Sequence, residues 1–92
     1  MEYPSEEDLK IIEKWDDLSD PKGWFDFIRD VWDCPEYGWD VKESDRFITY
    51  KMSTGGWSGN EDIVSAMSKS IMWPFTWEQS SRGGHFVFQI RR

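Results

Sequence analysis

The stretch Thr54–Asn60 constrains the fold more than any other part of this chain. It holds three of the seven glycines within five residues, and Trp57 stands among them. Glycine adopts backbone torsions that residues with a Cβ avoid, so the stretch predicts a sharply shaped turn. Alternating apolar residues precede it, and apolar residues at helical spacing follow it. We therefore expect a strand, a glycine turn and a helix in succession, with the turn as the first candidate for a binding site.

Two helices are predicted ahead of this turn. Ser5 is the expected N-cap of the first, because three acidic residues follow it and favour the positive end of a helix. This helix is expected to end near Ser19. Its apolar side is formed by Ile11, Ile12, Trp15 and Leu18.

The second helix has Asp20 as its expected N-cap and Pro21 at its first position. Pro35 ends it. The short link between the helices predicts an antiparallel pair. The apolar face comprises Trp24, Phe27, Ile28 and Val31, widened by Phe25 and Trp32.

After the second helix, residues 34–45 are predicted to form a loop and Arg46–Ser53 a strand. Asn60 is the expected N-cap of a third helix. The apolar side of that helix comprises Ile63, Val64, Met67 and Ile71.

The rest of the chain predicts a β-hairpin. Trp73, Phe75 and Trp77 alternate along its first strand, where Pro74 requires a sheet edge or a bulge. A turn at residues 81–84 leads into a last strand with alternating Phe86, Phe88 and Ile90. The whole order is α-α-β-α-β-β. It predicts an α+β fold in one domain, residues 1–92, with a small antiparallel sheet of about three strands and helices packed on it.

Charge is distributed unevenly along the chain. Residues 1–45 carry a net charge of −10 and residues 46–92 one of +3. An acidic surface repels phosphate backbones, so general nucleic-acid binding is not expected. Two interpretations stay open for the acidic half: a solvated face that aids solubility, or a surface that engages a basic protein.

Cys34 is the only cysteine, which rules out an internal disulfide and is typical of a reducing cytosol. The sequence has no apolar run long enough to span a membrane, and its first residues do not resemble a secretory signal. A cytoplasmic location is therefore expected.

Enzymatic chemistry has little support in the sequence. One histidine and one cysteine form no Cys/His metal cluster, and neither a metal nor a cofactor is expected. A serine nucleophile would need His85 as its base, and Ser80, Ser81 and Glu78 lie near it in the chain. Closeness along a hairpin is not the geometry of a catalytic triad, so no catalytic residue is assigned.

The turn at Thr54–Asn60 is a poor match for a phosphate loop, because no Gly-Lys-Ser/Thr follows it. Glu61 and Asp62 would also oppose an anion at the start of the helix. The turn suits hydroxyl groups or a nucleobase edge, with Trp57 stacking on the base. The alternative is a structural turn whose Trp57 packs into the core.

The segment Ser80–His85 gathers two hydroxyls, a guanidinium, two glycines and an imidazole. The planar fork of Arg82 suits phosphate or carboxylate. Together with Trp57 and Trp77, this tip could hold a small, flat, phosphorylated ligand. The alternative is a plain solvent-exposed hairpin tip.

Two strings carry a resemblance to a known group of proteins. They are Ser-Thr-Gly-Gly-Trp-Ser-Gly-Asn-Glu-Asp-Ile and Phe-Thr-Trp-Glu-Gln-Ser-Ser-Arg-Gly-Gly-His-Phe-Val-Phe. The chain resembles, over about residues 47–90, a family of short uncharacterised proteins in phage and prophage genomes. The resemblance implies no activity, only a context: small phage proteins that counter host defences, some by sequestering nucleotide signals and others by blocking a basic partner.

These observations favour a non-enzymatic phage accessory protein that sequesters a small nucleotide-like signalling molecule. The expected ligand-binding residues are Trp57, Ser58, Asn60, Trp77, Ser81, Arg82, Gly83, Gly84 and His85. The indoles would stack, the arginine and glycine amides would hold phosphate, and the others would fix polar edges. A second copy of the chain could complete so small a site. An acidic inhibitor of a host defence protein is the alternative, and a nucleotide hydrolase the third.

Overall fold

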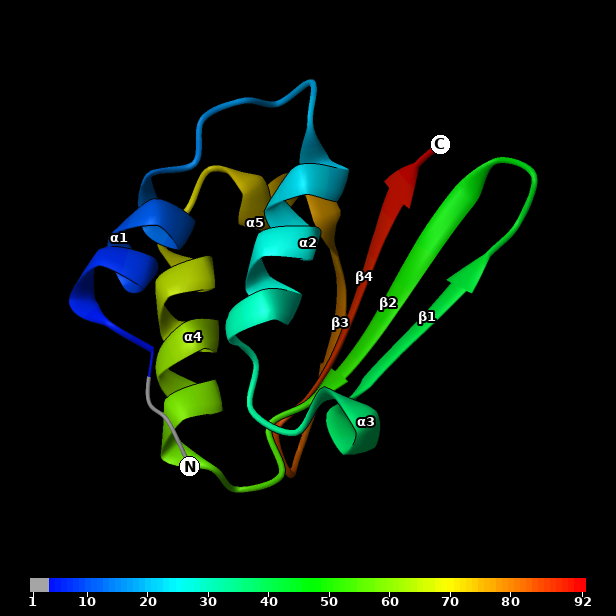
Figure 1. The fold of residues 1–92 in the computed structure, drawn as a ribbon. Helices are drawn as coiled ribbons and strands as arrows, with labels where there is room; N and C mark the ends of the chain where they lie inside the picture. The colour runs from blue at the N-terminus through cyan, green and yellow to red at the C-terminus, as the bar shows by residue number, and fades with distance from the viewer. Residues whose placement is uncertain (1–3) are drawn as a thin grey trace.

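The computed structural model describes residues 4–92 as helices packed on a β-sheet (Figure 1). The elements, in chain order, are α1 (Glu6–Lys14), α2 (Pro21–Val31), α3 (Pro35–Gly38), β1 (Trp39–Glu43), β2 (Phe47–Ser53), α4 (Ser58–Ser68), α5 (Met72–Thr76), β3 (Trp77–Ser81) and β4 (His85–Arg91).

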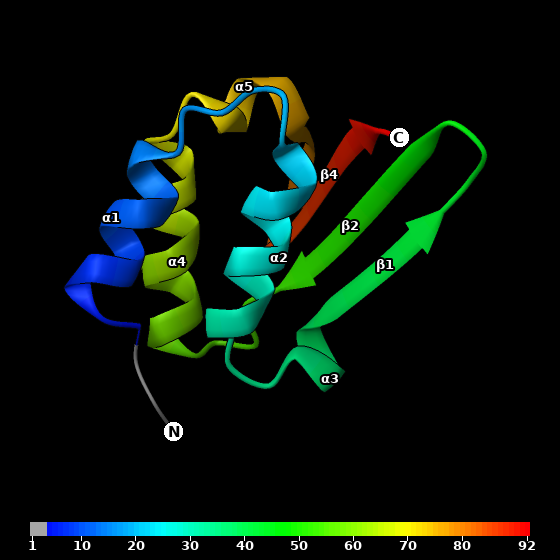
Figure 2. The same cartoon turned by 45° about the horizontal axis from the view of Figure 1, so that its top comes forward.

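The sheet has four antiparallel strands in the order β1-β2-β4-β3. This confirms the α+β class, although the sheet has one strand more than expected. The helices α1, α2 and α4 lie together on one side of it (Figures 1 and 2). Alternate residues of β2 and β4 face these helices, which is why Ile48, Tyr50, Met52, Phe88 and Ile90 are buried.

The cap of α1 is as predicted, but the helix is shorter. Ser5 Oγ accepts from the Asp8 amide at 3.0 Å, and Asp8 accepts from the Ser5 amide at 3.2 Å. The helix ends at Lys14, not near Ser19, because Asp17 forms a local turn by accepting from both the amide and the hydroxyl of Ser19. Leu18 is consequently 48% exposed, whereas Ile12 is buried and Trp15 packs against the core, so the predicted apolar side of this helix forms only in part.

The second helix begins as predicted, with Asp20 accepting from the Gly23 amide and Pro21 at the first position. It runs opposite in direction to α1 (Figure 2). Its Phe25 ring is fully buried and stacks on Tyr50, with ring centroids 4.1 Å apart and ring planes 12° apart. Burial, helped by the nearby carboxylates of Asp26 and Glu43, raises the pKa of Tyr50 to about 12, so the phenol stays neutral in the core.

The prediction that residues 34–45 form a loop is wrong, because they contain α3 and the edge strand β1. The strand escaped detection because it has almost no apolar face: only Trp39 is partly buried, and the following four residues are exposed. Its pairing with β2, from Trp39 opposite Met52 to Glu43 opposite Ile48, defines it instead.

The expected strand through Trp73 and Phe75 is wrong, because these residues belong to the short helix α5. Pro74 lies in the first turn of that helix, where its missing N–H breaks no intrahelical bond. Trp73 packs edge-on against Phe88, and Phe75 is 69% exposed. The hairpin strand β3 starts only at Trp77.

No helix within residues 4–92 combines the length and the apolar character needed to cross a membrane.

The Phe25–Tyr50 stack generates a stability prediction. Changing Phe25 to Ala should lower the free energy of unfolding by about 3–5 kcal/mol, because it empties a fully buried aromatic site. Phe27→Ala is the matched control, since Phe27 is only partly buried on the same helix. Urea unfolding of the two variants measures the difference. Equal losses would contradict the placement of Phe25.

Candidate functional site

The two glycine turns predicted from the sequence lie at the same end of the sheet. Ser53, at the end of β2, pairs with His85, at the start of β4. One residue further on, the Thr54 amide donates to the Gly84 carbonyl at 2.9 Å. This bond joins the turn that enters α4 to the turn between β3 and β4.

Glycine is required at two positions of this junction. Gly84 has φ +77°, and a Cβ there would collide with Thr54 Oγ1. Gly55 has φ +64°, and a Cβ there would collide with the indole of Trp57. Trp57 therefore folds back over its own turn, where it remains partly exposed.

The prediction that Asn60 is the N-cap of α4 is wrong. The cap residue is Trp57, and Asn60 lies in the first turn of the helix. Its side chain is fully buried and fully engaged. Oδ1 accepts from the Asp33 amide at 2.8 Å, and Nδ2 donates to the carbonyls of Asp33 and Thr54 at 3.0 and 3.4 Å. This side chain ties the end of α2 to the glycine turn, a role that leaves it away from a ligand.

The remaining predicted site residues separate into two groups. Ser81, Arg82, Gly83 and His85 are exposed at the hairpin tip, and Ser58 is exposed where α4 begins. Trp77 lies at the other end of β3, opposite Phe88, with its indole N–H donating to Ser80 Oγ at 2.7 Å. Trp57 and Trp77 therefore stand at opposite ends of the hairpin region.

A groove with a volume of about 460 Å³ runs beside the junction of the two turns. Its walls come from α4, α5 and the start of β4. The lining residues are Thr54, Glu61, Val64, Ser65, Ser68, Trp73, Gly84 and Phe86. Gly84 is the one residue of the predicted site that lines it. Sequence reasoning missed Trp73 and Phe86 as site residues because both were assigned to the core faces of strands.

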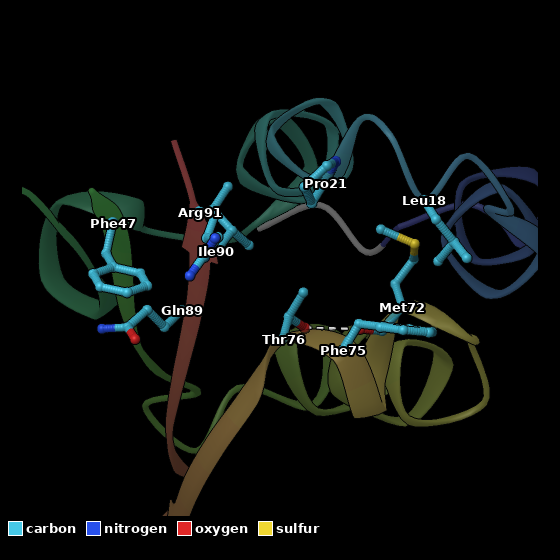
Figure 3. Close-up of a pocket in the computed structure, with 9 residues that line it drawn as sticks. All are labelled: Leu18, Pro21, Phe47, Met72, Phe75, Thr76, Gln89, Ile90 and Arg91. Atoms are coloured by element: carbon cyan, nitrogen blue, oxygen red, sulfur yellow. Dashed lines mark hydrogen bonds between the residues drawn. The ribbon is translucent and has the colours of Figure 1, made fainter. Parts of the chain in front are cut away.

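A second cavity of about 340 Å³ lies at the opposite end of β4 (Figure 3). Figure 3 shows Gln89 and Arg91 on one side of it, and Phe75 and Thr76 on the other. It is lined by Leu18, Pro21, Phe47, Met72, Phe75, Thr76, Gln89, Ile90 and Arg91. No sequence pattern predicts this cavity, because its lining residues come from four segments that are far apart in the chain.

His85 has a hydroxyl partner, but a different one from those considered in the sequence. Its Nδ1 lies 2.6 Å from Ser53 Oγ, across the β2–β4 pair. Within the described chain no carboxylate is hydrogen-bonded to His85, so the third member of a triad is absent there. Cys34 is also a weak nucleophile: burial raises the pKa of its thiol, and Asp33 and Glu36 add to the shift. Residues 4–92 hold no group of three or more His, Cys, Asp or Glu side chains placed to bind a metal ion.

No protein-family model, curated protein or solved structure matches this chain. The resemblance to phage and prophage proteins therefore stays a prediction from the two sequence strings.

The Asn60 contacts generate a second stability prediction. Asn60→Ala should lower the free energy of unfolding by about 1–3 kcal/mol, because it removes the side-chain partner of the part-buried N–H and C=O of Asp33 and one of the two hydrogen bonds to the buried Thr54 carbonyl. Asp62→Ala, at an exposed position of the same helix, should change it by less than about 0.5 kcal/mol. Thermal and urea unfolding test both. An Asn60→Ala protein as stable as the control would contradict a structural role.

Proposed function

We propose that this protein binds and sequesters a small nucleotide-like molecule in the groove between α4 and the β3–β4 hairpin. In this proposal it is a non-enzymatic phage accessory protein that removes a host defence signal. The observation that carries the proposal is the groove itself. Its volume of about 460 Å³ lies within the range of about 300–1,000 Å³ typical of small-molecule sites, and Gly84 of the hairpin turn lines it.

The lining of the groove suits a flat ring. Val64, Trp73 and Phe86 provide an apolar and aromatic wall, and base stacking on such side chains contributes about 1–3 kcal/mol. Glu61, Ser65 and Ser68 lie along α4 and offer acceptors and hydroxyls to a sugar or an exocyclic amine. Trp73 and Phe86 thus take the stacking role that the sequence suggested for Trp57 and Trp77.

The hairpin tip supplies the positive charge. Arg82 lies two residues from Gly84, is exposed, and has no ion pair among the residues that the structure describes. A phosphate leaving the groove at Gly84 would meet Arg82, the Gly83 amide and His85. The groove is open on one side, and the proposal includes a second copy of the chain that covers the ligand there.

A second candidate function rests on the acidic helical layer. Glu6, Glu7, Asp16, Asp17, Asp20, Asp26 and Asp30 are all exposed. The one salt bridge within residues 4–92 is Lys22–Asp26 at 2.9 Å. Most of this negative charge is therefore available to a basic surface, as an inhibitor of a host defence protein would require.

The sequestration proposal predicts a retained ligand. Protein incubated with nucleotide extracts of infected and uninfected host cells, then washed and denatured, should release a small molecule identifiable by mass spectrometry. Arg82→Ala should lower affinity about 10- to 150-fold, since a charge-assisted hydrogen bond contributes about 1.5–3 kcal/mol. Arg46→Ala, at the opposite end of the sheet, should leave capture unchanged.

A groove-filling variant gives the matched control. Ser65→Trp places an indole in the groove from an exposed position and should abolish capture without lowering the melting temperature. Asp62→Trp adds the same ring at an exposed position of α4 that does not line the groove. Recovery of no molecule from the wild-type protein, or equal recovery from the Ser65→Trp variant, would contradict the proposal.

The inhibitor candidate predicts a charge-dependent complex. Changing Glu6, Glu7, Asp16 and Asp17 to Lys should abolish binding to a basic host protein, and the wild-type complex should weaken as salt screens exposed charges. Co-purification from host lysate at low and high ionic strength measures this. Ser65→Trp should bind the partner normally. A charge-reversed protein that still inhibits the host pathway would exclude the acidic surface.

A further inference from the structure

The last part of β4 has a strand on one side only. β3 pairs with β4 from Ser81 opposite His85 to Trp77 opposite Phe88, and the chain before Trp77 turns away as α5. β4 itself continues to Arg91, paired with β2 along its whole length. Residues 89–91 therefore have no strand opposite them on the β3 side.

The direction of the backbone groups follows from the bonds at the two ends of β4. The Arg92 amide donates to the Arg46 carbonyl at 2.8 Å, and the Gly84 carbonyl accepts from the Thr54 amide at 2.9 Å. Even-numbered residues of β4 thus point their N–H and C=O groups toward β2, and odd-numbered ones point the opposite way. The N–H and C=O of Arg91 face the side without a strand, and within residues 4–92 they have no hydrogen-bond partner.

The space beside this edge is open. It is the 340 Å³ cavity of Figure 3, where β4 and α5 diverge. Thr76 Oγ1 is bonded to the Met72 carbonyl at 2.9 Å, and the Trp77 indole is held at Ser80, so neither side chain closes the gap. Its far wall is apolar and exposed, with Phe75 69% and Leu18 48% accessible.

Basic side chains outnumber acidic ones around the edge, four to three. Arg91 lines the cavity, and Arg46, Arg91 and Arg92 line an adjacent hollow of about 270 Å³ together with Asp45. Asp20, Lys22 and Glu43 line a further hollow beside Arg91 and Arg92. None of the three arginines lies within salt-bridge distance of a carboxylate in the described chain, and Arg92 instead donates to the Ser44 carbonyl at 2.9 Å.

We propose that this edge receives an extended acidic peptide as an added strand beside residues 89–91 of β4. The backbone of Arg91 supplies the ladder hydrogen bonds, and the cavity takes an apolar side chain of the peptide against Phe75 and Leu18. The arginines select acidic residues on either side of that apolar residue. This surface lies at the opposite end of the sheet from the proposed ligand groove, so it is a separate activity of the protein.

The test uses the full ¹⁵N-labelled protein and a synthetic peptide of about six residues that alternates Val and Glu. Titration should shift the Arg91 amide resonance and slow its hydrogen exchange at least about tenfold, because a free edge amide becomes bonded. The matched peptide with Lys in place of Glu should bind more weakly. Arg91→Pro removes the outward N–H without breaking a bond to β2, and it should abolish binding.

Arg91→Gln separates charge from backbone. It retains the amide and should weaken binding only about two- to fivefold, as is usual for one exposed charge. The proposal would be overturned if the Arg91 amide exchanged equally fast with and without the peptide. Equal affinity for the Glu and Lys peptides would also overturn it, and both measurements use the wild-type protein. A dimer that protects the same amide without peptide would also overturn it, since a second copy would then be the occupant.

Discussion

The contact between Phe25 and Tyr50 is the one on which the rest of the structure depends. It packs α2 against β2 through two stacked rings whose planes lie 12° apart. Phe25 also approaches Phe88 on the neighbouring strand, and Trp24 beside it donates its indole N–H to the Ile12 carbonyl at 3.0 Å, which holds α1. One helix turn therefore positions both the sheet and the outer helix. A shift of α2 would move Pro21, which lines the cavity of Figure 3, and Asp33, which Asn60 ties to the glycine turn.

Both candidate surfaces lie at the ends of β4, and for the same physical reason. A central strand satisfies its backbone along its length, while its ends lie where the neighbouring strands stop or turn. At the His85 end the neighbours turn, and two glycine turns meet there through the Thr54–Gly84 bond. At the Arg91 end one neighbour turns away as α5. Most of the acidic residues lie in the first half of the chain, and arginines lie at both ends of β4 on a protein that is acidic as a whole.

How far the sequence predicts this arrangement depends on whether the signal is local. Asp20 and Pro21 predict the start of α2, and the apolar alternation predicts β2 and β4, because caps and burial periods lie within a few residues of each other. β1 escaped detection, since an exposed edge strand has no apolar period. Trp73 and Phe75 alternate as strand residues do, but they lie in a short helix, which tolerates Pro74 because that residue is in its first turn. The role of Asn60 and the grouping of the groove residues depend on contacts with Asp33 and α5, which no local pattern encodes.

The strand order also decides when this protein can fold. β4 lies between β2 and β3, so the centre of the sheet is formed by segments as far apart in the chain as Phe47 and Arg91. Until residues 85–91 have been synthesised, β2 has only the exposed edge strand β1 as a neighbour, and Phe88 is missing from beneath Phe25. Such long-range pairing closes slowly, because loop entropy is lost before the contacts form. During translation the acidic helices α1 and α2 are therefore synthesised well before the strand that completes the core.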